Sequence, residues 1–229
     1  FVVWALSDYA TMHRKRYRRL PGLVDAWRQP KMAAAWIAAR YAERPILELH
    51  GDWGQRQEGH STTRRIHVFS NCRAVEIFLG DRSVAKLEGD THHALDVEAE
   101  AGLAIVARGR SGDQDLSAFL PWHGPAAALQ IRLAQSELDA DRRQTAEFDV
   151  CVVDSDGRLV LPWNGEVGVE ATGPVRARCY SHDATILISR GTGRGFVTAA
   201  GEDGDATVRV SAPGLGGATA TLTCRRHRP

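Results

Sequence analysis

Apolar and polar residues alternate with a period of two through most of the chain after residue 44, which predicts short, half-buried β-strands. Turn residues recur at about the 8–12-residue spacing that is typical of all-β sandwiches. We expect a first group of strands at 45–50, 66–70, 75–79, 83–87, 94–97 and 103–108. A second group is expected at 129–133, 146–153, 165–171, 185–189, 195–199, 206–210 and 218–223.

Two connections between these strands carry specific predictions. Asn71-Cys72-Arg73 separates two alternating segments and therefore predicts a β-hairpin. The glycine-rich run GTGRG at 191–195 resembles a phosphate-binding loop. A strand rather than a helix is expected after it, so no helix N-terminus is available to hold a phosphate. We therefore expect an ordinary turn at 191–195.

The first 43 residues follow a different pattern. An apolar segment, FVVWA, is followed by a polar and basic stretch and then by a helical pattern in which Trp36, Ile37 and Tyr41 share one face. Pro30 suits the first helical position, because its missing N–H would be unpaired there anyway. A single strand–loop–helix unit cannot bury both faces of its strand. We therefore expect this segment to be a piece of a longer protein.

These patterns predict a mainly β fold with two sandwich domains after one β/α unit. We place the β/α unit at 1–43, the sandwiches at 44–123 and 124–224, and a disordered tail at 225–229. Pro45 supports the first boundary, because proline disfavours helical geometry in the residue before it. About seven short strands in a hundred residues make the second sandwich immunoglobulin-like.

Several segments resemble glycoside hydrolase family 2, which includes β-galactosidases, β-glucuronidases and β-mannosidases. The segments WALSDYAT, GLVD, RQPKMAA and RY are similar to the end of the family's catalytic barrel. The segments IHVFSNCRAVEIFLGDRSV and SELDADRRQTAEFDVCVVDSDGRLVLPW are similar to the two domains that follow it. The resemblance implies that 1–5 is the eighth strand of a TIM barrel and 30–41 its last helix. It also implies that the later domains are immunoglobulin-like sandwiches.

The resemblance implies a substrate-binding role for three residues at the end of the barrel strand. Trp4 would stack on the terminal sugar. Asp8 and Tyr9 would belong to the pocket wall, because barrel enzymes carry their active sites at the C-terminal ends of the strands. Asp8 could equally cap the loop that follows it.

No catalytic residue is carried over. Retaining glycosidases use two carboxyl groups about 5–5.5 Å apart, and in the resembled family both belong to Glu residues on earlier barrel strands. The acidic residues of the first 43 positions are Asp8, Asp25 and Glu43. None of them matches the family's catalytic motifs, so this chain alone is expected to be inactive.

The basic loop HRKRYRR at 13–19 is open to three interpretations. It is a solvated loop, or a phosphate-binding or nuclear-localisation patch. The third interpretation depends on the barrel resemblance. A loop that leaves the C-terminal end of a barrel strand lies on the active-site face, where its charge would attract an anionic saccharide such as a uronic acid or a sulfated sugar.

Composition narrows the remaining classes. Of 229 residues, 29 are Lys or Arg and 28 are Asp or Glu, and a net charge of +1 argues against a general nucleic-acid binder. Apolar runs are shorter than the ~20 residues of a membrane span. The four cysteines lack zinc-site spacing. We expect buried free thiols, with one bridge among Cys151, Cys179 and Cys224 as the alternative in an exported protein. No metal and no cofactor are expected, and neither compartment nor oligomeric state is indicated.

The leading interpretation is the C-terminal part of a family 2 glycoside hydrolase, most similar to the β-galactosidases. Its partners would be a carbohydrate substrate and the upstream barrel and N-terminal domains of the parent protein. The first alternative is a β-glucuronidase parent. The second alternative is a non-catalytic carbohydrate-binding or adhesive module, for which Trp53, Trp122 and Trp163 are the candidate surface aromatics. Such tryptophans more often seal domain interfaces.

Overall fold

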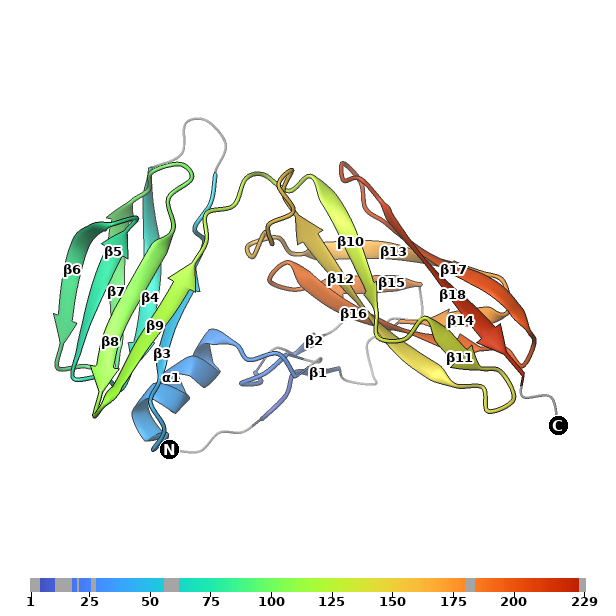
Figure 1. Cartoon of the computed structure of the whole chain (residues 1–229), viewed down its shortest axis with the longest axis horizontal. Helices are drawn as coiled ribbons and strands as arrows, with labels where there is room; N and C mark the ends of the chain where they lie inside the picture. Colours follow the sequence, from blue (N-terminus) through green and yellow to red (C-terminus); the bar gives the residue numbers. More distant parts are fainter. Residues whose placement is uncertain are drawn as a thin grey trace. The chain divides into compact units, whose positions relative to one another are not determined.

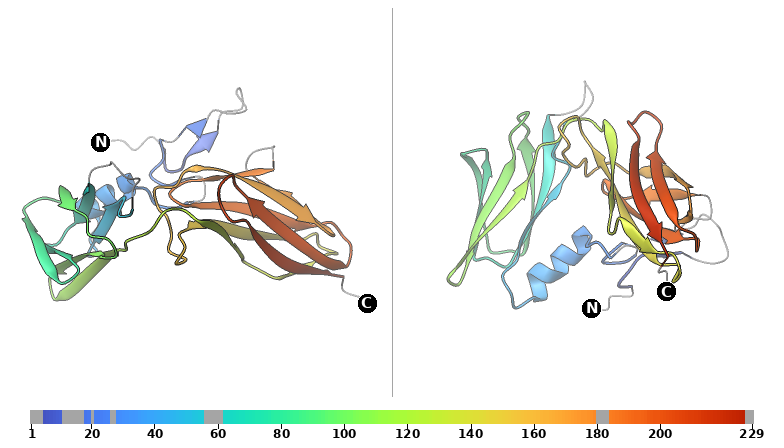
Figure 2. Two further views of the ribbon diagram at one scale, coloured as in Figure 1. Left: turned by 90° about the horizontal axis from the view of Figure 1, so that it is seen from above. Right: turned by 45° about the vertical axis from the view of Figure 1, so that its right-hand side comes forward.

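The computed structural model describes residues 5–10, 18–19, 21–25, 28–55, 62–179 and 184–226, with only the backbone at 9, 10, 18 and 19. The chain divides into two compact units, Phe1–Trp122 and His123–Pro229, called unit 1 and unit 2 below. Unit 1 contains one two-stranded and two larger β-sheets, and unit 2 contains two β-sheets (Figures 1 and 2). The fold is mainly β, as the period-two alternation predicts.

Unit 1 contains a sandwich of two antiparallel sheets with the strand orders β3-β4-β7 and β6-β5-β8-β9. The strands are β3 (Leu47–Gly51), β4 (Thr63–Ser70), β5 (Ala74–Leu79), β6 (Arg82–Glu88), β7 (His92–Glu98), β8 (Ile105–Ser111) and β9 (Gln114–Leu120). Their inward residues form the core, and Ile66, Ile77 and Ile105 are completely buried. Three strands facing four in this order is an immunoglobulin-like arrangement.

The helix α1 (Met32–Tyr41) lies against the outer face of the β3-β4-β7 sheet. Its alanine-rich sequence favours helix intrinsically, and Ala35 and Ala39 pack with Ile46 and Phe69 in a small buried cluster. The helix begins two residues after Pro30, where the sequence had predicted its start. No helix within the described residues is long and apolar enough to cross a membrane.

The predicted hairpin at Asn71-Cys72-Arg73 is wrong. β4 pairs with β3 and β7, whereas β5 pairs with β6 and β8, so the chain passes from one sheet to the other at this point. Asn71 shapes the crossover. Its Oδ1 accepts the N–H of Ile46 at 2.8 Å, and its Nδ2 donates to the carbonyls of Ala42 and Arg44 at 3.3 and 2.9 Å.

Unit 2 is a second sandwich, with the strand orders β10-β12-β16-β14 and β11-β18-β17-β13-β15. The strands are β10 (Ala128–Leu133), β11 (Glu137–Asp139), β12 (Thr145–Val153), β13 (Gly165–Thr172), β14 (Val175–Arg178), β15 (Thr185–Ile188), β16 (Thr192–Ala199), β17 (Gly204–Ser211) and β18 (Ala218–Arg225). All pairs are antiparallel except β11 with β18. Phe148, Val150, Ile186 and Val197 lie at the centre of the core.

The turn predicted at 191–195 is shorter than expected, because β16 already begins at Thr192. Two glycines of this run are strand residues in close contact with the core. A Cβ at Gly193 would lie 2.6 Å from Cγ2 of Ile186, and one at Gly195 would lie 2.4 Å from Cζ of Phe148. The glycines are therefore explained by packing, because a side chain has no room there.

Two predictions concern the ends of the chain. The predicted strand at 1–5 lies outside the described residues except for Ala5, which is not in a strand. The disordered tail predicted from residue 225 begins later, because Arg225 pairs with Asp139 in the β18–β11 ladder. Residues 227–229 lie outside the described part of the chain.

Candidate substrate-binding segment

The predicted site residue Asp8 is buried and serves as a hydrogen-bond acceptor inside unit 1. Its Oδ1 accepts the backbone N–H of Gly22 at 2.9 Å and Nζ of Lys31 at 2.7 Å. Its own backbone N–H donates to the carbonyl of Val24 at 3.0 Å. A buried carboxylate that is paired in this way stabilises a loop, because removing it would take away the acceptor of the buried Gly22 N–H.

Neighbouring residues complete this loop structure, which we call the Asp8 knot (residues 5–8, 21–25 and 28–31). Ser7 Oγ donates to the carbonyl of Asp25 at 3.0 Å, and Asp25 Oδ1 accepts the N–H of Gln29 at 2.9 Å. Gly22 packs directly on the backbone, since a Cβ there would lie 2.4 Å from the nitrogen of Asp8. The knot therefore requires glycine at position 22.

The knot joins the candidate site to the helix. Lys31 is the residue before α1, and its N–H donates to the carbonyl of Leu23 at 2.9 Å. The ion pair between Lys31 and Asp8 thus ties the start of α1 to the residue that precedes Tyr9. Sequence reasoning missed Lys31, because the two charges are 23 positions apart and no local pattern links them.

The other candidate residues are less fully described. Trp4 lies outside the described residues. The backbone of Tyr9 belongs to the short strand β1 (Tyr9–Ala10), which pairs with β2 (Arg18–Arg19) in the register Tyr9 with Arg19. Residues 11–17, which hold most of the basic loop, also lie outside the described part. The substrate-binding roles of Trp4, Asp8 and Tyr9 therefore remain predictions.

The carboxylates of this segment have structural partners or lie at the surface. Asp8 and Asp25 are buried and accept backbone hydrogen bonds, whereas Glu43 is exposed. A retaining glycosidase needs a carboxyl pair that faces the substrate. Nothing in the arrangement of these three residues forms such a pair.

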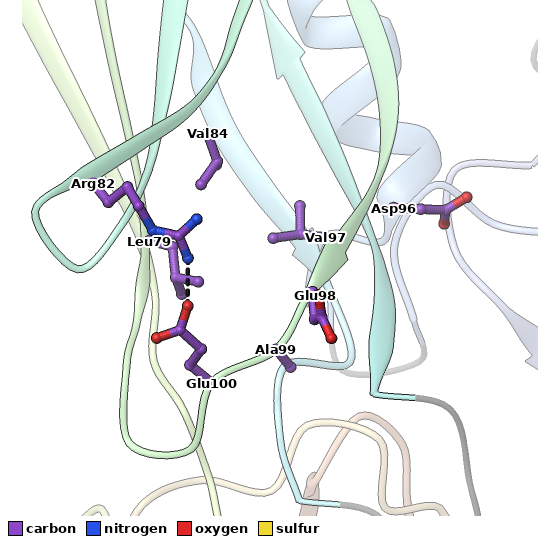
Figure 3. A pocket seen from close by; sticks show the side chains of 8 residues that line it. All are labelled: Leu79, Arg82, Val84, Asp96, Val97, Glu98, Ala99 and Glu100. Carbon is purple, nitrogen blue, oxygen red and sulfur yellow. Dashed lines mark hydrogen bonds and ion pairs between the residues drawn. The ribbon is translucent and has the colours of Figure 1, made fainter.

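A recess of about 330 Å³ opens between the edges of the two sheets of unit 1 (Figure 3). Leu79, Val84 and Val97 form its apolar side, and Arg82 is paired with Glu100 at its rim. In Figure 3 the side chain of Asp96 points away from these residues. The recess is an opening at the sandwich edge, and Arg82 neutralises one of the three carboxylates that line it.

Three histidines, His50, His67 and His92, lie on the outer face of the β3-β4-β7 sheet, where their rings contact Phe69. His67 Nδ1 lies 3.0 Å from His92 Nε2, and the two rings stack 5.3 Å apart. Burial, with the nearby charges of His92, Arg65 and His50, lowers the pKa of His67. A neutral His67 can share a proton with His92, which explains the contact. Among the described residues no three His, Cys, Asp or Glu side chains are placed to hold a metal ion.

The tryptophans proposed as surface aromatics are not surface platforms. Trp53 is 1% exposed and donates from Nε1 to the carbonyl of Leu103 at 2.7 Å. Trp122 is half-buried and meets Trp53 edge to face, with ring centroids 6.2 Å apart. Trp163 is half-buried and packs on the core of unit 2. All four cysteines are free.

No protein-family model matches the chain. A β-glucuronidase of Formosa agariphila is 26% identical over 89% of this chain and 22% of its own length. The solved structure of a β-glucuronidase from glycoside hydrolase family 2 is 26% identical, covers 96% of this chain and 24% of that one, and superposes with a TM-score of 0.78. A β-glycosidase structure from Bacteroides vulgatus shares the fold, at 17% identity over 96% of this chain and 30% of its own, with a TM-score of 0.75.

The chain spans about a quarter of the length of the curated relatives that it matches. The two curated relatives cover 93% and 89% of this chain, and the β-glucuronidase structure covers 96% of it. These comparisons support a C-terminal fragment of a glycoside hydrolase family 2 protein.

Proposed function

We propose that the chain is the C-terminal part of a retaining glycosidase that removes terminal β-linked glucuronic acid. The observation that carries the proposal is the 26% identity to a β-glucuronidase over 96% of the chain, with a TM-score of 0.78. The sequence motifs favour a β-galactosidase parent, whereas the matched curated relatives are named as β-glucuronidases. The β-glucuronidase alternative therefore becomes the leading specificity.

The basic loop at 13–19 supports an anionic sugar. Six of its seven residues are His, Lys or Arg. In the resembled barrel this loop lies on the active-site face. A cationic loop raises the local concentration of a negatively charged substrate, and the effect weakens as salt is added.

The proposed division of labour assigns catalysis to residues outside this chain. Glycoside hydrolysis with retention needs an acid/base carboxyl and a nucleophilic carboxyl close together. Asp8 and Asp25 already accept hydrogen bonds from the Asp8 knot, so neither is free to act. This chain would instead contribute the end of the sugar pocket, with Trp4 stacking on the sugar and Asp8 and Tyr9 in its wall.

The Asp8 knot gives that contribution a physical basis. Asp8 follows Trp4 by four positions, and its carboxylate is fixed by Gly22 and Lys31. Fixing this point restricts the backbone on either side of it. Asp8 is accordingly proposed to position the pocket wall rather than to contact the sugar through Oδ1.

Activity assays test the proposed specificity. The 229-residue chain is expected to release no nitrophenol from 4-nitrophenyl β-D-glucuronide, because it lacks a catalytic carboxyl pair. A longer protein that includes the chain and the preceding barrel is expected to cleave this substrate in preference to the β-D-galactoside. Turnover by the 229-residue chain, or preference for the galactoside in the longer protein, would contradict the proposal.

Trp4→Ala in the longer protein tests the pocket assignment. Burying an aromatic ring against a ligand contributes on the order of 1–3 kcal/mol, so kcat/KM should fall roughly 10- to 100-fold at ~1.4 kcal/mol per decade. The melting temperature should change little. Asp8→Ala is the contrasting variant, since it should lower thermal stability as well as activity. Unchanged kinetics in Trp4→Ala would remove this residue from the pocket.

A further inference from the structure

The outer face of the β6-β5-β8-β9 sheet carries an aromatic row. Phe78 on β5 lies opposite Val106 on β8, and Val106 lies opposite Phe119 on β9. These three residues alternate with the buried ones on their strands, so they share the outer face. Phe119 is 63% exposed to solvent, which is the highest value among the exposed large apolar residues of the described chain.

The helix of unit 1 does not cover this face. α1 contacts β3 and β4, which belong to the opposite sheet. The four strands β6, β5, β8 and β9 lie side by side as one layer (Figure 1). The aromatic row therefore runs across three neighbouring strands of a sheet that has its other face against the core.

An arginine, Arg108, lies next to the row and opposite Glu76 of β5. The guanidinium carbon of Arg108 lies 4.8 Å from the centroid of the Phe78 ring. Within the described ranges, Arg108 forms no ion pair with a carboxylate. A guanidinium held over a ring keeps its edge N–H groups available for a carboxylate or sulfate.

The neighbouring charges on this face are already matched. Lys86 lies 3.7 Å from Glu76, and Glu76 also accepts a hydrogen bond from Ser83 at 2.6 Å. Arg110 lies 3.8 Å from Asp115. Arg108 is thus a cation of this face without an ion pair among the described residues, and it lies over the ring of Phe78.

The size and shape of the row indicate what kind of ligand it fits. Three residues across three strands cover far less than the roughly 800 Å² per partner of a stable protein–protein interface. The row is also on a flat sheet rather than in a pocket that would enclose a small molecule. Phe78 and Phe119 are two strand spacings apart. Because neighbouring strands are ~4.8 Å apart, the separation is about 10 Å. This length suits two sugar rings of an extended chain.

From these observations we propose that the Phe78–Val106–Phe119 row, with Arg108, binds an acidic saccharide chain, one whose sugars carry carboxylate or sulfate groups. The apolar faces of two neighbouring sugar rings lie along the row from Phe119 to Phe78. Arg108 donates to the acidic substituent. The site belongs to the sandwich of unit 1 and does not depend on the proposed catalytic specificity.

The test uses the full 229-residue chain and two matched probes. An oligomer of β-1,4-linked glucuronic acid and a cello-oligosaccharide of the same length differ only in the carboxylate. Binding is measured by calorimetry and by chemical-shift changes of backbone amides. Wild-type protein should bind the acidic oligomer, with shifts on β5, β8 and β9, and should bind the neutral one more weakly.

Variants separate the two contributions. Phe119→Ala should weaken binding of both oligomers roughly tenfold, since an exposed aromatic contact is lost. Arg108→Gln should remove the preference for the acidic oligomer. Arg209→Gln, which removes an exposed arginine from unit 2, should leave binding unchanged. No binding by wild-type protein at millimolar oligomer, equal binding by all variants, or self-association that Phe119→Ala abolishes would each overturn the proposal.

Discussion

Trp53→Ala is expected to destabilise unit 1 by about 3–5 kcal/mol, the range for removing a large buried aromatic side chain. Trp53 is the largest of the fully buried side chains. The substitution leaves a cavity and removes the edge-to-face contact with Trp122. It also orphans the carbonyl of Leu103, which accepts the indole N–H at 2.7 Å. That bond joins residues 50 positions apart and fixes the loop before β8.

Native-state hydrogen exchange is the measurement of choice, because the two units need not unfold together. Amides of β4 and β8 should show the loss in opening free energy, whereas those of β12 and β17 should not. Trp53→Phe should cost less, since it keeps most of the volume and leaves a smaller cavity, although it also loses the hydrogen bond to Leu103. Phe119→Ala is the control for an exposed aromatic and should fall within about 0.5 kcal/mol of wild type. A small effect of Trp53→Ala would mean that the loop is held by other contacts.

The second large effect is expected in unit 2, at Asp154. This residue is 3% exposed and organises the turn after β12. Its Oδ1 accepts the N–H groups of Asp156 and Arg158 at 3.0 and 2.8 Å, and its Oδ2 accepts that of Gly124 at 2.7 Å. Asp154→Ala leaves three donors unsatisfied, and we expect a loss of about 2–4 kcal/mol. The DSDG sequence thus acts as a turn anchored by one carboxylate.

Acidification should reproduce part of this loss. Burial alone would raise the pKa of Asp154, but the N–H donors of Gly124, Arg158 and Asp156, with the charge of Arg158, outweigh it and lower the pKa. A carboxyl whose folded pKa is depressed binds protons more readily in the unfolded state. Its stabilisation is therefore complete above the unfolded value of about 3.9 and is lost as the pH falls through the lower, folded pKa.

Chemical denaturation between pH 7 and pH 2.5 tests both the anchoring role of Asp154 and the loss of stability in acid. Hydrogen exchange of the β12 and β16 amides reports on unit 2. Asp154→Ala should be less stable at pH 7 and should lose less on acidification than wild type. Asp156→Ala, in the same turn, removes only a surface ion pair with Arg158 and should cost less than about 0.5 kcal/mol. Equal stabilities of the two variants at pH 7 would contradict the anchoring role of Asp154.

The strands that sequence reasoning missed share a physical property. β9 (Gln114–Leu120) follows a polar stretch and lies at the edge of its sheet, so only one side pairs with another strand. β11 and β14 are short edge strands as well. Edge strands bury little side-chain surface, and much of what defines them is backbone hydrogen bonding. A pattern of side-chain polarity therefore carries little information about them.

In the candidate site, too, the local sequence indicated some features, and others appear only in the folded chain. Asp8 was recognised both as a pocket candidate and as a possible loop cap, from its place after an apolar segment. That its carboxylate pairs with Lys31 and Gly22 appears only when the chain is folded. The glycines at 193 and 195 were assigned to a turn, whereas Phe148 and Ile186 from other strands explain them.

The sequence by itself determined the mainly β fold, the position of most strands and of the helix, and the family resemblance. Each of these follows from local alternation or from motifs that stay together along the chain, because the face that a residue presents depends on its near neighbours. The predicted helix face was wrong in part, because Ala35 and Ala39 are buried whereas Tyr41 is 60% exposed. Only the tertiary structure decided that β4 and β5 lie in different sheets, that Asp8 holds the start of α1, and that Phe119 and Arg108 lie on the same face of one sheet. These relations join residues distant in sequence, and no local pattern fixes them, because many pairings satisfy the same alternation.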